Sequence, residues 1–510
     1  MLKGSAIRAM LMGLAVLSVT IGGDIEAQAK EKCDKNCCLA QGRKVVIVHT
    51  NDIHGNLEPD SKGRGGLTRI ATLIKELRQE NPGALLYLDA GDDAQGTPVS
   101  NIFHGEPMFK AITLMGADAG TVGNHEYDWG LKVQKEMYSN AGYPIVAANV
   151  YRDGKNVFKP YIIKEVNGIK VGIIGIISDQ MASLVKKGNT EDLVFADPAE
   201  TCLKFIPKMY KDGAQLIVAL SHCGVDAEQE IARRCPAIDI IVGGHSHTRV
   251  EPAINVGGHT WVVQADHYGR CLGHIDLQVN PYNGKIYDFK YELIPVVKDA
   301  NIPADPEIQA IADQYNAKVR PLMEQVVGKM EGTLSKECPA GLLDSTLGNV
   351  ICDALRTESG ADIAVYNYGG IRIESLASGE VKLDSVFRLL PFDDPTVVVK
   401  MKGSDIWELM EQMVNSNVGP LQTSGLEVVC NMDTKTVTSV KVGGKDLDRE
   451  AYYMVATTEF LAKGGDSYKA LGKGEIVKLL DITRDIFVKY FKDKGTVSVP
   501  ATGRVVIKNN

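Results

Sequence analysis

Short apolar runs recur along the first half of the chain, and most of them end in a cluster of polar residues. Four runs have the length and apolar character of buried strands, namely 44–49, 84–88, 216–220 and 238–242. A weaker run at 116–121 precedes a further polar cluster, and residues 67–77 repeat apolar side chains at helical spacing. Alternation of this kind up to about residue 295 predicts an α/β domain.

One helix separates this region from a second one of similar pattern. Asp305 can cap the helix, Pro306 suits its first position, and Pro321 should kink or end it. Strands and helices resume after residue 330. We expect a signal peptide at 1–29, a cysteine-containing tail at 30–43, a domain at 44–298, a linker helix and hinge at 299–332, and a second domain at 333–510. A surface helix inside one large domain is the alternative, but it fits ordinary domain sizes less well.

The first 29 residues have the pattern of an export signal. Lys3 and Arg8 give a positively charged start before an apolar run at 9–21, and Ala27-Gln28-Ala29 offers a cleavage site. A buried or membrane-anchoring helix is the alternative, but the run is short for a membrane span. We therefore expect an exported protein, without stable membrane insertion, that resides in a periplasm, on a cell surface or outside the cell.

Composition narrows the range of partners. The chain has 510 residues, of which 44% are hydrophobic and 24% charged, as in ordinary multidomain globular proteins. A net charge of -8 argues against broad binding to nucleic acid. Ten cysteines could form disulfides in an oxidising compartment. Their pairing is open, and Cys223 with Cys235 is one candidate pair.

The polar clusters contain the side chains that divalent metals bind in proteins. In chain order they are Asp52-Ile53-His54, Gly91-Asp92, Gly123-Asn124-His125-Glu126, Ser221-His222 and Gly244-His245-Ser246-His247. Carboxylate and amide oxygens and imidazoles all bind such ions. Since the carboxyl ends of neighbouring strands meet at one edge of a sheet, we expect a dinuclear metal centre there. Ordinary loop polarity is the alternative, and five such clusters in order disfavour it.

Two neighbouring ions need a shared ligand, and a carboxylate with two oxygens serves best. We assign this bridging role to Asp92. One ion would be completed by Asp52, His54 and His247, and the other by Asn124, His222 and His245. Two aspartates leave such a site net positive, so it can hold a hydroxide and a phosphate.

His125 follows a proposed ligand and is the candidate catalytic proton donor. Asp128 lies three residues later and could orient its ring through a hydrogen bond. We expect Glu126 to be a local structural acceptor.

Over residues 45 to about 293, these motifs resemble the calcineurin-like metallophosphatase domain. The mature chain as a whole resembles the secreted 5′-nucleotidase family, which includes bacterial UDP-sugar hydrolases. The resemblance implies a four-layer α/β/β/α sandwich and a second α/β nucleotide-binding domain, joined by a helix and able to rotate. It implies the metal ligands and the His–Asp pair named above. It also implies two divalent ions, for which zinc or manganese is expected in preference to magnesium or cobalt. Several members have Asn or Gln at the position of His247, which leaves the metal preference open.

Residues of the second half match the nucleotide-binding positions of this family. The loop Asn367-Tyr368-Gly369-Gly370-Ile371-Arg372 resembles its Asn-Gly-Gly-Gly-Ile-Arg loop, in which Arg372 would meet phosphate or ribose oxygens. Phe392 and Phe460 match the aromatics that sandwich the base, and Asp466 matches the acid that binds ribose hydroxyls. The chain departs from the pattern twice, because 341–346 lacks the arginine common there and Tyr368 replaces a glycine.

We therefore expect an exported enzyme that attacks nucleoside 5′-phosphates with a metal-bound hydroxide. AMP is the expected substrate, with di- and triphosphates as further candidates. Two alternatives use the same metals: a 2′,3′-cyclic-nucleotide 2′-phosphodiesterase with 3′-nucleotidase activity, and a UDP-sugar hydrolase. A nucleotide-binding surface protein is the alternative without catalysis. The preferred base, the metal and the oligomeric state are left open by the sequence.

Overall fold

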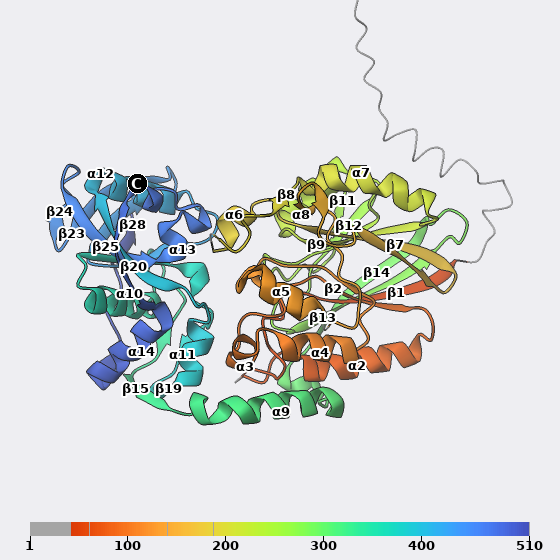
Figure 1. Cartoon of the computed structure of the whole chain (residues 1–510), viewed down its shortest axis with the longest axis horizontal. Coiled ribbons are helices and arrows are strands. Elements are labelled where there is room, and N and C mark those ends of the chain that lie inside the picture. Colours follow the sequence, from red (N-terminus) through yellow and green to blue (C-terminus); the bar gives the residue numbers. More distant parts are fainter. Residues whose placement is uncertain (1–41, 61, 140, 187, 509–510) are drawn as a thin grey trace, which may run out of the picture.

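The computed structural model describes residues 42–60, 62–139, 141–186 and 188–508. The expected signal peptide and nearly all of the expected tail lie outside these residues. The chain forms an amino-terminal and a carboxyl-terminal lobe, and helix α9 (Pro306–Met323) runs along the lower edge of the amino-terminal lobe towards the carboxyl-terminal one (Figure 1). In the described residues no helix is both long and apolar enough to cross a membrane.

The amino-terminal lobe is built on two sheets packed face to face. The first has the order β14 (Ile286–Pro295), β13 (Cys271–Val279), β1 (Arg43–Thr50), β2 (Leu85–Asp89), β3 (Ala119–Gly120). The second has the order β11 (Ile254–Val256), β12 (Thr260–Val263), β10 (Ile240–Val242), β9 (Leu216–His222), β7 (Ile169–Ile177), β6 (Tyr161–Val166). Strands β1, β2 and β3 run parallel, as do β7, β9, β10 and β12, so each set ends at one edge.

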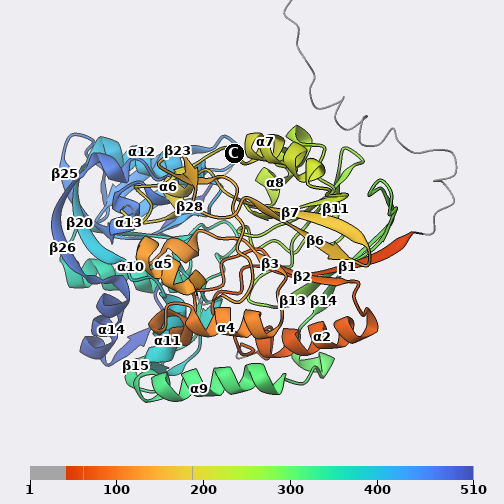
Figure 2. The ribbon, with the colours of Figure 1, turned by 45° about the vertical axis from the view of Figure 1, so that its right-hand side comes forward.

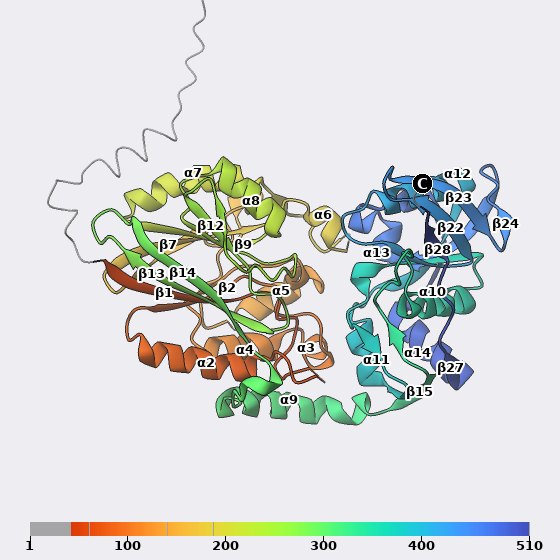
Figure 3. The same ribbon diagram turned by 180° about the vertical axis from the view of Figure 1, so that it is seen from behind.

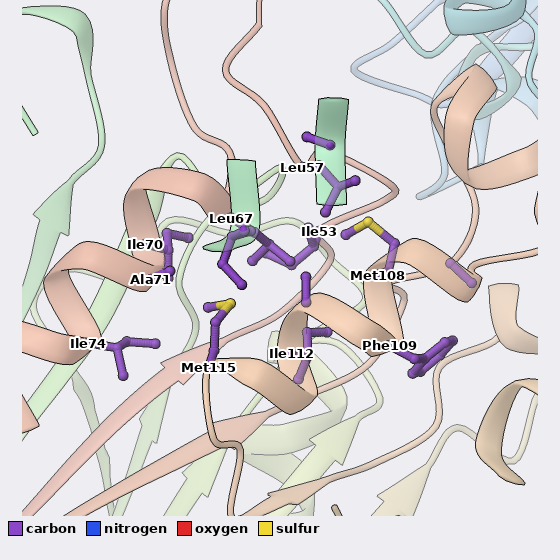
Figure 4. Close-up of a cluster of buried hydrophobic side chains, with 14 of the residues drawn as sticks. Ile53, Leu57, Leu67, Ile70, Ala71, Ile74, Met108, Phe109, Ile112 and Met115 are labelled. Atoms are coloured by element: carbon purple, nitrogen blue, oxygen red, sulfur yellow. The ribbon is translucent and has the colours of Figure 1, made fainter. Parts of the chain in front are cut away.

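The side chains of β1 alternate between two apolar cores. Val45 and Ile47 pack between the sheets, while Val46 and Val48 face the helices outside. Outside the first sheet lie α2 (Leu67–Glu80) and α4 (Glu106–Leu114), and Figure 4 shows their apolar side chains together. Helices α7 (Pro198–Lys211) and α8 (Val225–Arg234) cover the second sheet. The predicted α/β/β/α sandwich is therefore confirmed.

Helix α9 belongs to the amino-terminal lobe by its packing. The Asp305 carboxylate accepts hydrogen bonds from the backbone N–H groups of Glu307 and Ile308, and the helix ends two residues after Pro321. Its buried face joins the core formed by α2 and α4 through Ile308, Ala312, Tyr315, Val319 and Met323. The helix is therefore fixed to the amino-terminal lobe by contacts along its length.

The carboxyl-terminal lobe is a second α/β unit, as predicted. Its central sheet has the order β21 (Leu421–Ser424), β17 (Ile363–Asn367), β25 (Tyr452–Thr458), β20 (Pro395–Lys402), β26 (Glu475–Ile482). Helices α10 (Thr346–Ser359) and α14 (Thr483–Lys494) share an apolar core on one face, and α12 (Gly403–Val414) lies in a second core on the other. Helix α10 ends at Gly360, whose φ of 72° suits glycine.

The candidate bridge between Cys223 and Cys235 is wrong. Both are free thiols, as are the other five cysteines of the described residues. Cys223 and Cys235 lie with Cys202 in the apolar core beneath α7 and α8, where a thiol packs as a small hydrophobic group.

Candidate metal centre and adjoining cavity

All seven candidate ligands lie at or just beyond the carboxyl ends of parallel strands. Asp52 and His54 follow β1, Asp92 follows β2, Asn124 follows β3, His222 ends β9, and His245 and His247 follow β10. Six of them form two groups, Asp52 with His54 and His247, and Asp92 with His222 and His245. Within each group the potential ligand atoms lie within 4.8 Å of one another.

The Asp92 carboxylate lies between the two groups. Its Oδ2 is 3.0 Å from His222 Nε2 and 3.9 Å from His54 Nε2. The amide Oδ1 of Asn124 is 2.8 Å from His245 Nδ1, which places the seventh candidate in the second group. Potential ligand atoms from several loops thus lie close enough together for two cations to bind among them.

The backbone is strained at most of these positions. Asp52, His54, Asp92, His245 and His247 have φ values of 51°, 49°, 59°, 77° and 53°. Non-glycine residues rarely adopt this left-handed conformation, and clusters of such strain are typical of functional sites. Hydrogen bonds between the loops hold it here, from Asp52 N to Gly91 O at 2.9 Å and from His54 N to Asp92 O at 2.9 Å.

Two of the histidines are oriented by the backbone. His54 Nδ1 donates to Gln95 O at 2.8 Å and His222 Nδ1 donates to Ala90 O at 2.6 Å. Each bond directs the lone pair of Nε2 towards the carboxylates. Burial raises the pKa of the Asp52 carboxyl to about 7, although the neighbouring His222 lowers it. A divalent cation would stabilise the charged carboxylate, so the donor set fits two such ions.

Glu126 ties two ligand loops together. Its buried carboxylate accepts hydrogen bonds from the backbone N–H of Asp92 at 3.0 Å, Asp93 at 2.8 Å, Ala94 at 3.2 Å and Gly123 at 2.7 Å. The loop that carries Asp92 is thereby bound to the loop that carries Asn124.

His125 and Asp128 form a hydrogen-bonded pair at the mouth of the centre. His125 Nδ1 donates to Asp128 Oδ2 at 2.8 Å, and the two side chains are 14% and 19% exposed. Burial lowers the pKa of His125. The carboxylates of Asp128 and Asp92 together raise this pKa by more than burial lowers it, so the net shift is upward. The shift favours a protonated ring, and this ring stacks on Phe392 with centroids 5.5 Å apart.

The second lobe reaches directly into the metal-ligand groups. Arg372 Nη2 lies 3.1 Å from His54 Nε2, and Tyr268 OH donates to Arg372 O at 3.4 Å. Asn101 Nδ2 donates to Pro391 O at 2.7 Å across the same boundary. Helix α6 (Met181–Leu184) extends from the first lobe to the second, as Figures 1 and 3 show, and Figure 2 shows the lobes from another angle.

A cavity of about 540 Å³ lies between the lobes. Its wall includes every residue predicted to bind substrate: Asn367, Gly369, Gly370, Arg372, Phe392, Phe460 and Asp466. It also includes His125, Asp128 and four candidate ligands, Asp92, Asn124, His245 and His247. Asp52, His54 and His222 are not part of the wall and lie fully buried. Its volume is in the range of small-molecule sites.

Two predicted substrate residues bind each other. Asn367 Nδ2 donates to Asp466 Oδ2 at 2.6 Å, and Asp466 has a φ of 51°. A Cβ at Gly370 would lie 2.7 Å from both Asn367 Oδ1 and Tyr366 Oη, so only glycine fits there.

Several residues of the cavity wall were missed by sequence reasoning. Lys186, Lys336, Trp129, Asn417 and Asp394 are among them. None of the five belongs to a motif. Lys186 and Trp129 come from loops of the amino-terminal lobe, and the other three come from the carboxyl-terminal lobe. No local pattern in the sequence marks any of these five residues.

Known proteins resemble the chain along most of its length. The family described as calcineurin-like phosphoesterase matches residues 45–249, and the 5′-nucleotidase C-terminal domain matches residues 326–473. The protein UshA of Yersinia enterocolitica is 30% identical over 478 residues, which cover 83% of this chain and 86% of that protein. A 5′-nucleotidase of Vibrio cholerae is 30% identical over 480 residues, covering 83% and 86%.

Solved structures share the arrangement of both lobes. A 5′-nucleotidase precursor from Thermus thermophilus superposes with a TM-score of 0.83 at 29% identity, covering 92% of this chain and 100% of that one. The sulfate thiohydrolase SoxB of the same organism has a TM-score of 0.79 at 19% identity, covering 91% and 97%. Because two differently named enzymes share the fold, the fold alone does not determine the substrate.

Proposed function

Because the chain belongs to the 5′-nucleotidase family of metallophosphoesterases, we propose that it releases phosphate from nucleoside 5′-monophosphates such as AMP, with di- and triphosphates as further substrates. One observation carries this proposal: a single cavity joins the candidate metal ligands to the candidate nucleoside-binding residues. A phosphate at the ligand groups would thus have its nucleoside within reach of both phenylalanines.

The donor set suits two divalent ions. Asp52, His54 and His247 would hold one, Asn124, His222 and His245 the other, and Asp92 would bind both. When bound, the ions supply an activated water and stabilise the negative charge of the transferred phosphoryl group. Four imidazoles favour zinc, and the carboxylates and amide also accept manganese, ahead of magnesium or cobalt.

The chain's own residues would act on both ends of the substrate. His125, protonated and oriented by Asp128, would donate a proton or a charged hydrogen bond from Nε2 to the phosphoryl or leaving oxygen. Arg372 would bind phosphoryl oxygens through its planar fork. Phe392 and Phe460 would stack on the base, while Asn367 and Asp466 would bind ribose hydroxyls.

The two half-sites must separate for substrate to enter and product to leave. We place the rotation in the segment after Met323, because α9 itself packs into the amino-terminal core. The proposal includes export from the cytoplasm. It also includes a small-molecule rather than a nucleic-acid substrate, because the net charge of -8 disfavours broad binding to nucleic acid.

The deciding experiment measures phosphate release from AMP by the metal-stripped protein after reloading with Zn²⁺, Mn²⁺ or Mg²⁺. The cyclic nucleotide 2′,3′-cyclic AMP and UDP-glucose run in parallel, and p-nitrophenyl phosphate tests the metal centre without a base. We expect metal-dependent release that is fastest from AMP. Faster turnover of either rival substrate would replace the proposed specificity. Nucleotide binding without any turnover at full metal content would favour the surface-protein alternative.

A further inference from the structure

Lys336 lines the cavity without an ion pair to any of the described residues. It directly follows the short strand β16 (Leu334–Ser335), and its side chain is half-buried. The ammonium group lies over the ring of Tyr368, 4.5 Å from the centroid. The aromatic face holds the charge in place electrostatically but does not neutralise it.

The charged groups near Lys336 leave a positive wall. Burial and, to a smaller extent, the charge of Arg372 lower the pKa of Lys336 to about 8. Glu374 acts in the opposite direction, but this residue is exposed. Two cations that face one cavity repel each other, and an anion between them would remove that cost.

The surroundings of Lys336 link the two departures from the family pattern. The N–H of Ser335 donates to Thr346 Oγ1 at 2.8 Å, so Lys336 adjoins 341–346, the segment without an arginine. Tyr368, which replaces a glycine, supplies the ring under the lysine. Both changes therefore lie next to Lys336, which lines the cavity, although neither Tyr368 nor 341–346 is part of the cavity wall.

We propose that Lys336, positioned by Tyr368, binds the phosphate group of the substrate as a second cation beside Arg372. This rests on the proposed function only in that the substrate is a phosphate ester. An ammonium group suits the role, because its three donors adapt to phosphate oxygens as a compact charge. Tyr368 is a positioning residue that does not touch the phosphate.

The test is calorimetric binding of inorganic phosphate to the metal-loaded full chain, which needs no turnover. Lys336→Met should weaken phosphate binding on the order of tenfold, in line with loss of a charged hydrogen bond. Lys336→Arg should retain most of the affinity. Lys400→Met is the matched control, since Lys400 also lies over a tyrosine ring, 4.9 Å from the centroid of Tyr452, but outside the cavity wall.

Adenosine binding separates phosphate recognition from loss of folding. It should be equal in all the variants, because adenosine carries no phosphate. Tyr368→Leu should weaken phosphate binding by a smaller factor and add nothing in the Lys336→Met background. Unchanged phosphate affinity in Lys336→Met, or an equal loss for adenosine, would overturn the proposal. Failure of AMP hydrolysis would overturn the proposed nucleotidase specificity and leave the phosphate result readable.

Discussion

The two halves of the cavity are prepared for their ligands in different ways. In the amino-terminal half, Asp52, His54 and His222 are fully buried, and hydrogen bonds to the backbone orient them. In the carboxyl-terminal half, Arg372, Phe392 and Phe460 are only partly buried. The buried Nε of Arg372 has no hydrogen-bond partner within the described residues.

This difference follows from what each half must recognise. Metal ligands have to converge on one point, and strained backbone and complete burial hold the side chains in the positions that this requires. A base is recognised by its faces, and stacking tolerates small displacements. Under the proposed function, the nucleoside-binding half would move away and return, while the metal-binding half would keep its geometry.

Loss of the bridging carboxylate should have the largest effect. Asp92→Ala is expected to lower kcat/KM for AMP by about a thousandfold or more, because bound metals contribute several kcal/mol to such reactions. Phosphate release and metal content by mass spectrometry measure the two consequences. Asp288→Ala is the control, because Asp288 is an exposed residue of strand β14 far from the ligand loops in the sequence. A variant with full metal content and normal activity would exclude Asp92 from the centre.

His125→Ala should remove catalysis while it leaves metal binding intact. We expect kcat to fall by roughly 10²–10⁴, the usual contribution of general acid catalysis. His274→Ala is a matched control, since His274 Nδ1 also pairs with a carboxylate, Glu292 at 3.0 Å, and is 16% exposed. If both variants lose the same activity, the loss is structural and His125 has no special role.

Phe460→Ala should change nucleoside recognition alone. We expect KM for AMP to rise roughly 5–150-fold, from the stacking energy of about 1–3 kcal/mol. Turnover of p-nitrophenyl phosphate, which carries no base, should stay the same. Phe289→Ala is the control, because that ring stacks on Trp261 in the other lobe. Equal losses for both substrates would contradict the division of labour between the halves.

Asp305→Ala should have the smallest effect and act on stability only. Loss of the cap of α9 should lower the free energy of unfolding by about 1 kcal/mol, measured by urea titration. Burial raises the pKa of Asp305. Lys75 and the helix N–H groups together lower this pKa by more than burial raises it, so the net shift is downward. Its stabilisation is therefore present at neutral pH and should be lost as the carboxyl protonates below about pH 4.

Asp313→Ala on the exposed face of the same helix is the control for this measurement. A difference between Asp305→Ala and the wild type that stays constant down to pH 3 would show that capping by the charged carboxylate is not its cause.

The sequence by itself determined much of the amino-terminal half. Runs such as 44–49 and 216–220 became β1 and β9, and the polar residues after them meet at one edge. Local periodicity specifies strands, and parallel strands bring their ends together, so the ligand motifs could be recognised before any coordinates. The substrate residues were predicted by resemblance, because a lone phenylalanine or aspartate carries no local signal.

Only the tertiary structure decided how the halves meet. Four features depend on contacts between segments that are distant in the sequence. They are the packing of α9 against the first lobe, the contact of Arg372 with His54, the free thiols of Cys223 and Cys235, and the position of Lys336 over Tyr368. Such contacts arise from shape and charge complementarity across the folded surface. A pattern along the chain records which face a residue presents, but not which partner that face meets.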